Sequence, residues 1–393
     1  MNIGIDATCW WNNRGFGRFT REMLTAMFRL ESDHRFYLFV DQPLSELSQF
    51  ENVQVIEARS SRPTTEAAVA DGSRSPVSMY KLCRAVASCP LDIMFFPAVY
   101  SWFPVPLRIP AMVTLHDAIA ERYPKLIFPN WRGRLFWAIK MKSAVWTSRR
   151  ILTVSRAAKA EIIQYIGVSS EKIDITTEAP SPAFQQVDDD ARTRDVRQRY
   201  KLPLDAPIIV FVGGLAPHKN LHGLLDGYEK SLSSSRVKDV SLVLVGDFKG
   251  AGFYSNYDSL HNRVRSNPEL CKRVHFTGYV PEEDLVSLYN TALAVAMPSY
   301  SEGFGLPAVE AMACSAPVLS SDRGSLPEVV GEAGIYFDPF DVTDISRAIN
   351  EMVENDALRQ QLSRNALAIA RGFTWQKAAE LTLTHLEGMR RRC

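Results

Sequence analysis

The sequence predicts a two-domain α/β protein in which each domain contains a parallel β-sheet covered by helices. Three observations lead to this class. The chain has 393 residues, which is enough for two domains of ordinary size that each bury a core. Short runs rich in Val, Ile and Phe alternate with longer segments of helical spacing, as a parallel sheet between layers of helices requires. A polar stretch that contains prolines divides these runs into two series.

The first series predicts seven strands in the N-terminal domain. Each run is short and apolar, so it suits a strand that is buried on both faces, and the longer segments between the runs have helical spacing. The predicted strands are residues 2–7, 35–40, 53–58, 91–98, 111–116, 151–155 and 173–177.

The boundary between the domains is predicted near residue 188. Pro180-Ser181-Pro182 disfavours helix, and the polar run 188–199 offers little apolar surface for burial, so this stretch is expected to be a linker. The predicted domains are residues 1–187 and 188–372, followed by a C-terminal helical segment of residues 373–393.

The second series predicts six strands in the C-terminal domain: residues 207–213, 241–246, 274–278, 293–297, 317–320 and 334–337. Only helical patterns follow them. Thr374 stands where it can cap a final helix that includes residues 378–389.

Composition and charge exclude several classes of protein. Hydrophobic residues make up 46% of the chain and charged residues 23%, which argues against a disordered or fibrous protein. The formal net charge is +1, so the chain has no overall field to hold a polyanion, and no nucleic-acid partner is expected.

The charge is nevertheless unevenly distributed. Residues 1–187 carry 22 Lys or Arg against 17 Asp or Glu, whereas the remainder carries 23 against 27. The densest basic stretch is 121–150, where Glu121 is the single acid. This stretch is either a solvated helix face or a surface for anionic lipid or a phosphorylated acceptor.

Cysteine usage and hydropathy predict a cytoplasmic protein. The six cysteines form no C-x-x-C pair, which is typical of a reducing compartment. The chain begins without a basic leader and apolar run, and no window approaches 18 uncharged apolar residues. We expect neither secretion by a signal peptide nor a membrane span, with the inner face of the membrane as a further possible location.

The clearest motif is Ser301-Glu302-Gly303-Phe304-Gly305-Leu306-Pro307, which follows a predicted strand and opens a predicted helix. Glycines let the backbone approach a phosphate, and the amides and dipole at a helix N-terminus attract an anion. Glu302 in the loop and Glu310 one turn into the helix can reach different parts of one ligand. The segment therefore predicts a phosphate-binding site with two carboxylates.

A second motif, Phe211-Val212-Gly213-Gly214-Leu215-Ala216-Pro217-His218-Lys219-Asn220, also lies at the carboxyl end of a predicted strand. Ligands of open α/β sheets bind at these ends, and a lysine there offers a point charge to a diphosphate. We therefore predict Lys219 as the phosphate cation.

The segment Gly15-Phe16-Gly17-Arg18-Phe19-Thr20 follows the first strand. A dinucleotide fingerprint would need a third glycine where Thr20 stands, so an NAD site is disfavoured. A glycine loop whose amides approach a phosphate or a sugar fits better, and an ordinary turn is the alternative.

The fourth motif is Thr114-Leu115-His116-Asp117, where an apolar strand ends in a histidine and an aspartate. A single histidine is more often structural than catalytic, but its place at a strand's carboxyl end makes His116 a candidate.

No metal or other cofactor is expected. Asp188-Asp189-Asp190 resembles a metal-binding Asp-x-Asp motif, yet it lies in the predicted linker with no strand to present it. His218 and His222 have chelating spacing but no third ligand in the sequence pattern.

Taken in this order, the motifs resemble the retaining glycosyltransferase family 4, nucleotide-sugar-dependent enzymes of the GT-B fold that include bacterial lipopolysaccharide and exopolysaccharide mannosyl- and glucosyltransferases. The resemblance spans nearly the whole chain and is strongest over residues 208–339. It implies two facing Rossmann-like domains, with the acceptor on the first, the donor on the second, and a last helix that crosses back to the first domain.

The resemblance also implies roles for single residues. Glu302 would bind the hydroxyls of the donor sugar and stabilise an oxocarbenium-like transition state, Glu310 would hold the ribose, and His116 would contact the reacting sugar. Diphosphate contacts would come from Lys219, Gly213, Gly214 and residues 303–306, closed over by Gly15 and Gly17, and base contacts from the backbone around Val280.

One departure from the family pattern concerns phosphate binding. Many relatives carry an arginine at the position of Gly214, and His218 stands here in place of an arginine before Lys219. Arg18, Arg156 and Arg323 are candidates to compensate.

The sequence thus predicts a metal-independent, retaining hexosyltransferase that uses a nucleoside diphosphate sugar and a glycan or lipid-linked glycan acceptor. A nucleotide-sugar epimerase or a phosphorylase on the same fold is the nearest alternative. A non-catalytic protein that binds a nucleotide sugar is the alternative from a different class.

Overall fold

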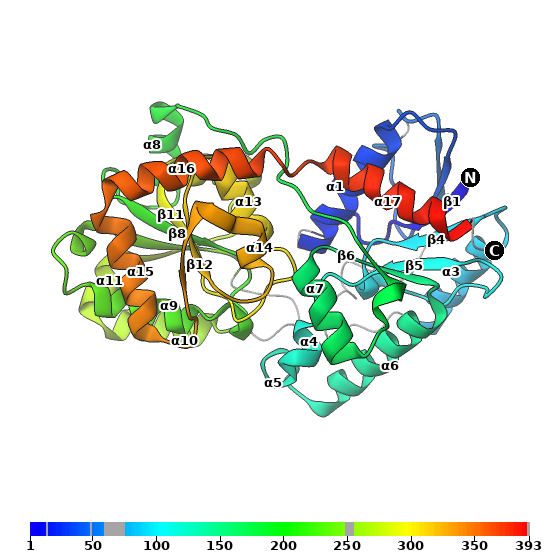
Figure 1. The fold of residues 1–393 in the computed structure, drawn as a ribbon, viewed down its shortest axis with the longest axis horizontal. Helices are drawn as coiled ribbons and strands as arrows, with labels where there is room; N and C mark the ends of the chain where they lie inside the picture. Colours follow the sequence, from blue (N-terminus) through cyan, green and yellow to red (C-terminus); the bar gives the residue numbers. More distant parts are fainter. Residues whose placement is uncertain (13–14, 48, 59–74, 248–254, 391–393) are drawn as a thin grey trace. The chain divides into compact units, whose positions relative to one another are not determined.

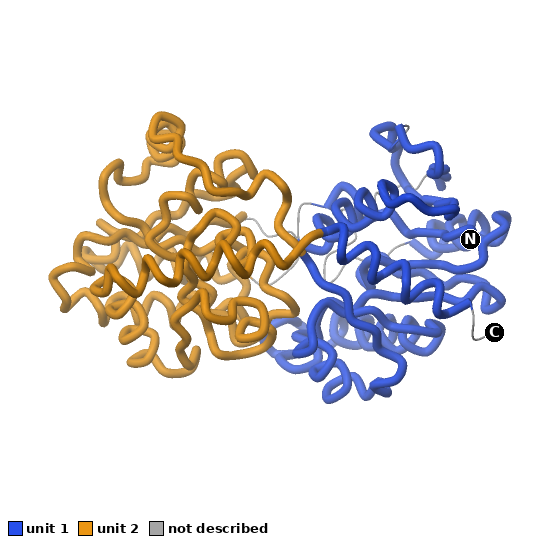
Figure 2. Tube along the Cα trace, turned by 45° about the horizontal axis from the view of Figure 1, so that its top comes forward, with its two compact units in different colours: residues 1–178, 375–393 blue, residues 179–374 orange. Residues whose placement is uncertain are grey.

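The computed structural model describes residues 1–12, 15–47, 49–58, 75–247 and 255–390. The chain forms two units (Figure 2): unit 1 consists of Met1–Glu178 and Trp375–Cys393, and unit 2 of Ala179–Thr374. Each unit contains one parallel sheet, which confirms the predicted class of two α/β domains. The structure places the division after residue 178 and again after residue 374, whereas the sequence analysis placed it after residues 187 and 372.

The sheet of unit 1 has the order β3-β2-β1-β4-β5-β6-β7, with every neighbouring pair parallel. Its strand β1 pairs Ile3 with Phe36 of β2 on one side and with Ile93 of β4 on the other. Each predicted strand is present. The strands are β1 (Asn2–Asp6), β2 (Arg35–Val40), β3 (Val53–Glu57), β4 (Ile93–Phe96), β5 (Ala111–Thr114), β6 (Arg150–Thr153) and β7 (Ile173–Ile175).

Helices of unit 1 form where apolar residues recur at helical spacing. In the first helix, Phe19, Met23 and Met27 are fully buried while the opposite face is polar. The helices are α1 (Gly15–Arg29), α3 (Pro76–Ala87), α4 (Ile119–Arg122), α5 (Pro124–Ile127), α6 (Trp131–Thr147), α7 (Arg156–Glu161) and α17 (Trp375–Arg390) (Figure 1).

The C-terminal helix α17 packs against α1 in unit 1, as the family resemblance implied. It begins directly after Thr374. The Trp375 ring meets the edge of Phe19, with ring centroids 5.9 Å apart. The Thr176 hydroxyl donates to the carbonyl of Ala378 over 3.1 Å, so the helix is fixed to the end of β7 as well.

The sheet of unit 2 has the order β10-β9-β8-β11-β12-β13, again entirely parallel. Alternate residues of β8 enter different cores: Ile209 and Phe211 pack on one face of the sheet, and Ile208 and Val210 pack on the other. The six predicted strands are present. They are β8 (Ile208–Val212), β9 (Ser241–Val245), β10 (Val274–Gly278), β11 (Ala292–Met297), β12 (Val318–Ser321) and β13 (Gly334–Phe337).

The helices of unit 2 contribute further apolar residues to the cores on both faces of the sheet. They are α8 (Asp190–Arg199), α9 (Leu221–Ser231), α10 (Tyr257–Ser266), α11 (Pro268–Arg273), α12 (Glu282–Asn290), α13 (Leu306–Ala313), α14 (Leu326–Val330), α15 (Val342–Glu354) and α16 (Asp356–Ala370).

The linker expected over residues 188–199 is wrong, because most of this run is helix α8 of unit 2. The Asp189 carboxylate caps the helix by accepting from the amide of Arg192. Val196 is buried, and the Arg197 guanidinium donates to the carbonyls of Pro203, Leu204 and Ala206. This polar helix is therefore held mainly by hydrogen bonds, together with the buried side chain of Val196. The composition of the run did not predict these contacts.

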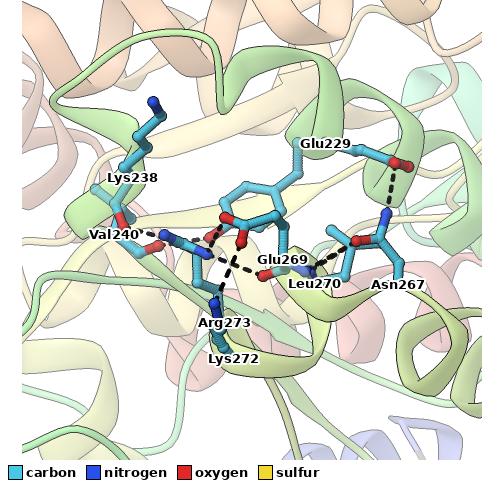
Figure 3. A network of polar contacts seen from close by, with 9 residues as sticks. Glu229, Lys238, Val240, Asn267, Glu269, Leu270, Lys272 and Arg273 are labelled. Atoms are coloured by element: carbon cyan, nitrogen blue, oxygen red, sulfur yellow. Dashed lines mark hydrogen bonds and ion pairs between the residues drawn. The ribbon is translucent and has the colours of Figure 1, made fainter.

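A polar network connects α11 to its neighbours (Figure 3). The Asn267 side chain accepts from the amides of Glu269 and Leu270, capping α11, and donates to Glu229 of α9 over 2.6 Å. At the other end, Arg273 donates to the carbonyl of Lys238 over 2.8 Å. Both ends of this short helix are thus fixed outside the sheet, away from the carboxyl ends of the strands.

Candidate functional site

Glu302 lies at the carboxyl end of the unit 2 sheet, in the loop between β11 and α13. Within that loop Gly305 has φ +98°, a left-handed conformation that turns the chain into the first turn of α13. Amides in a first helical turn have no partner within the helix and point along the positive end of its dipole. The predicted residues Gly303, Phe304, Gly305 and Leu306 thus form a helix N-terminus of the kind that binds anions.

Glu302 and Lys219 form an ion pair inside unit 2. The Lys219 ammonium donates to both carboxylate oxygens of Glu302, over 2.7 and 2.9 Å. The Ser299 hydroxyl donates to Glu302 Oε1 over 2.5 Å. Glu302 is 8% exposed, so the pair lies in a setting where its electrostatic interaction is strong. The two residues predicted separately as cation and carboxylate are therefore in direct contact.

The pKa of Glu302 lies below its ordinary value of 4.5. Burial on its own raises the pKa of a carboxyl group, but here the Lys219 charge and the hydrogen bonds from Lys219 and Ser299 outweigh that effect. Glu302 is consequently an anion at neutral pH and is suited to stabilise positive charge on a bound ligand.

Lys219 is presented by a short 3-10 turn, Pro217–Lys219, that follows β8. The next residue, Asn220, has φ +53° and donates its side-chain amide to the carbonyl of Pro339 over 2.7 Å. The amide of Tyr300 donates to the carbonyl of His218 over 2.9 Å. The loops after β8 and β11 are therefore tied together, which explains why Lys219 meets Glu302.

Gly324 and Ser325 contact the loop that contains Glu302 and support it. The sequence analysis gave neither residue a role at this site. The buried Ser325 hydroxyl lies within hydrogen-bond distance of the carbonyls of Glu302 and Phe304, at 3.0 and 2.8 Å. Gly324 has φ +60°, and a Cβ there would lie 2.7 Å from the amide nitrogen of Glu302. The Gly-Ser pair that follows β12 is the sequence feature that could have indicated these contacts.

Gly213 and Gly214, which follow β8, differ in how strictly each position requires glycine. Gly213 has φ +153°, and a Cβ on the adjoining Gly246 would lie 2.0 Å from the carbonyl oxygen of Gly213. A Cβ on Gly214, by contrast, would have no atom within 4 Å. A side chain at position 214 is therefore sterically allowed.

His218 does not supply the missing second cation. Burial, together with the neighbouring Lys219 charge, lowers the pKa of His218 to about 4, so the ring is neutral at physiological pH. Arg323 lies in the same unit but is paired with Asp322 and Asp338, each over 3.0 Å. The other two candidates, Arg18 and Arg156, belong to unit 1.

Glu310 and Val280 lie deeper in unit 2. Glu310 is 2% exposed, and Tyr289 donates to it over 3.4 Å. Val280 is buried and lies two residues after Gly278, which has φ +76°. Val280 therefore offers a ligand its backbone and not its side chain.

His116 of unit 1 follows the end of β5 and is held from two sides. Its Nδ1 lies 3.2 Å from Glu178 Oε1, and its Nε2 lies 3.0 Å from the carbonyl oxygen of Pro97. Each ring nitrogen therefore faces an oxygen atom that can accept a hydrogen bond. Phe19 meets the ring edge-on, with centroids 4.7 Å apart. Sequence reasoning missed Glu178 and Pro97 because both are distant in the chain.

The glycine loop expected at Gly15 and Gly17 is wrong in its conformation, because both residues lie in the first turn of helix α1. A Cβ on Gly17 would lie 2.0 Å from the carbonyl oxygen of Asn12, so this position requires glycine. The amides still stand at a helix N-terminus, the arrangement that attracts anions.

Two further findings concern the described residues alone. They contain no group of three or more His, Cys, Asp or Glu placed to hold a metal ion. They also contain no helix that is long and apolar enough to cross a bilayer.

The chain is similar to known families over most of its length. Residues 14–176 match the family described as Glycosyltransferase Family 4, and residues 192–368 match Glycosyl transferases group 1. It is 32% identical over 273 residues to O-antigen chain mannosyltransferase B of Escherichia coli, covering 70% of this chain and 69% of that protein. It is 27% identical to the serotype-specific mannosyltransferase WbdA of the same organism, and spans about half of WbdA, covering 98% of this chain and 47% of that protein.

Solved structures show the same fold at lower identity. Sucrose-phosphate synthase of Thermosynechococcus elongatus superimposes with a TM-score of 0.74 at 18% identity, covering all of both chains. Anabaena HepE in complex with UDP-glucose gives 0.72 at 20% identity, covering 99% of this chain and 100% of that one.

The first prediction concerns pH. Because the folded-state pKa of Glu302 is depressed, its contribution to stability is present above pH 4.5 and is lost as pH falls through the folded-state value. The free energy of unfolding of the wild type should therefore fall towards that of Glu302→Gln below pH 4.5. Denaturant titrations of both proteins across this pH range measure the difference, and a difference independent of pH would contradict the assignment.

Proposed function

The chain belongs to the glycosyltransferases, with a family 4 region in unit 1 and a group 1 region in unit 2, and from this premise we propose that it transfers a hexose from a nucleoside diphosphate sugar to a hydroxyl group of a glycan or lipid-linked glycan. The observation that carries the proposal is the Lys219–Glu302 pair beside the N-terminus of α13. The two mannosyltransferases of Escherichia coli make mannose the first sugar to test, and HepE bound to UDP-glucose supports a nucleotide-sugar donor.

Lys219 and the amides at the start of α13 would stabilise the departing diphosphate. Negative charge grows on the phosphate oxygens as the glycosidic bond breaks, and preorganised donors in a poorly solvated site stabilise that charge strongly. The helix amides need no proton transfer, and the lysine is already charged. This arrangement supplies the electrostatic role of a metal ion, so we propose that the reaction is metal-independent.

Glu302 would act on the sugar. Its carboxylate is ionised and nearly buried, so it can accept hydrogen bonds from the hydroxyls of the sugar and favour the positive charge that develops at the anomeric carbon. In the structure Lys219 donates to both of these carboxylate oxygens. A diphosphate would compete for Lys219 and thereby free the carboxylate for the sugar.

His116 would contact the reacting sugar from unit 1, with its ring held by Glu178 and Pro97. We further propose that the anomeric configuration is retained, as in the family that the sequence resembles.

The second prediction tests the function itself. The purified chain, offered GDP-mannose or UDP-glucose and glycan acceptors, should form a glycosylated product, with activity unchanged by EDTA and with the donor's anomeric configuration retained by NMR. Product without acceptor would favour an epimerase, and a need for free phosphate would favour a phosphorylase. Tight nucleotide binding with no turnover over a broad screen would favour the non-catalytic alternative.

The third prediction concerns the site residues. Glu302→Gln, Lys219→Ala and His116→Ala should each lower kcat/KM about a hundredfold, the usual effect of losing one preorganised transition-state contact. The matched controls are Glu332→Gln and Lys272→Ala, two separate substitutions at exposed positions, and both should keep wild-type activity. Thermal unfolding must accompany the assay, because removing one partner of a buried ion pair also destabilises the fold. Full activity in all three variants would overturn the assignment.

The fourth prediction uses the open space at Gly214. Gly214→Arg places a cation where the structure has room for a side chain, so it should lower KM for the donor with a smaller effect on kcat. Gly214→Gln is the control for side-chain volume. An equal gain from Gln, or no gain from Arg, would show that position 214 does not face the diphosphate.

A further inference from the structure

Helix α6, which is labelled in Figure 1, carries an unusual exposed apolar face on unit 1. Its inner side is buried through Gly133, Met141 and Ala144, and the Asn130 side chain caps its start by accepting from the amide of Gly133. The outer side carries large apolar side chains that are half to three-quarters exposed: Trp131, Leu135, Phe136, Ile139 and Trp146. Scattered apolar residues are normal on a surface, but five on one helix form a patch that needs an explanation.

The exposed residues follow the helical repeat. Trp131, Leu135, Ile139 and Trp146 are separated by four or seven positions, so they lie in one stripe along the outer face. Trp131 and Trp146, at the two ends of this stripe, are exposed to 70% and 77%. The stripe therefore reaches both ends of the helix.

Basic side chains lie within and beside the stripe, and the helix contains no acidic residue. Lys142 falls in the same row as Ile139 and Trp146, and Arg132 lies over the Trp131 ring with its guanidinium carbon 5.7 Å from the ring centroid. No carboxylate among the described residues pairs with Arg132, Arg134 or Lys142. The surface thus combines tryptophan rings, aliphatic side chains and cations without internal neutralisation.

We propose that α6 docks unit 1 onto the surface of an anionic lipid bilayer. Tryptophan rings favour the boundary between headgroups and acyl chains, while Lys and Arg attract anionic headgroups from the same depth. A second copy of the chain is a poorer occupant. Pairing two identical faces about a twofold axis would bring Arg132 and Lys142 of both copies together without any acid to neutralise them.

The docked helix would lie next to the His116 site. Trp137 of α6 packs against Tyr100, with ring centroids 5.3 Å apart, and Lys140 donates to the carbonyl of Tyr100. The same loop supplies the Pro97 carbonyl that accepts from His116. An acceptor anchored in lipid would thus be offered close to the residue proposed to meet the sugar. The docking itself does not depend on the proposed transfer and is tested without it.

The experiment is co-sedimentation of the full chain with vesicles of phosphatidylglycerol and phosphatidylcholine, compared with phosphatidylcholine alone. The wild type should bind the anionic vesicles more tightly and should be released by high salt. The double variant Trp131→Ser, Trp146→Ser should bind at least about tenfold more weakly, the change expected when two inserted rings are lost.

Two further variants complete the test. Arg132→Gln with Lys142→Gln should weaken binding to anionic vesicles and leave the weak binding to phosphatidylcholine unchanged. The matched control Val77→Ser with Tyr80→Ser changes two exposed residues on α3 of the same unit and should bind like the wild type.

Unchanged binding in the tryptophan variant, or an equal loss in the α3 control, would overturn the proposal. So would a wild type that does not sediment with vesicles but forms a dimer that the tryptophan variant abolishes, because the face would then join two copies. Retained sugar transfer to a soluble acceptor in the tryptophan variant separates failed docking from failed catalysis.

Discussion

The nearly buried ion pair between Lys219 and Glu302 is the interaction on which the proposed chemistry of unit 2 depends. A carboxylate with so little exposure is costly unless a cation and hydrogen bonds compensate it, and here the ammonium and the Ser299 hydroxyl do so. Holding the pair requires the loops after β8 and β11 to meet, which the Tyr300–His218 hydrogen bond achieves, while the Ser325 contacts fix the Glu302 loop to the segment after β12. The pair therefore keeps both charges ready for a ligand and prevents either from being buried alone.

The proposed phosphate binding relies on fewer charges than the family pattern suggests. Gly214 carries no side chain and His218 is neutral at physiological pH, so Lys219 is joined at the site by helix amides and not by a second guanidinium. An amide array at a helix N-terminus carries only a partial positive charge, and it acts over a short range. Donor affinity in such a site depends strongly on correct placement of the α13 turn, which explains the conformational demands at Gly305 and Gly324.

The strands could be predicted from sequence because each is a short apolar run, and helix α13 because glycines and a proline mark its start. Three kinds of feature escaped. Helix α8 has little apolar periodicity and is held by Asp189 and Arg197 hydrogen bonds, so its composition indicated a linker. Gly15 and Gly17 were expected in a loop whose amides approach a phosphate or a sugar, yet packing of the Phe19 face favours helix. Ser325 and Glu178 act through contacts with distant residues, and no local pattern in the sequence marks such contacts.

The central claim, that Lys219 exchanges Glu302 for a diphosphate, is tested most directly by a crystal structure of the chain with a bound nucleoside diphosphate. The account predicts a phosphate oxygen within hydrogen-bond distance of Lys219 Nζ, further phosphate oxygens at the amides that begin α13, and a Glu302 carboxylate released from at least one lysine contact. A diphosphate bound elsewhere, with both Lys219–Glu302 hydrogen bonds intact, would contradict it.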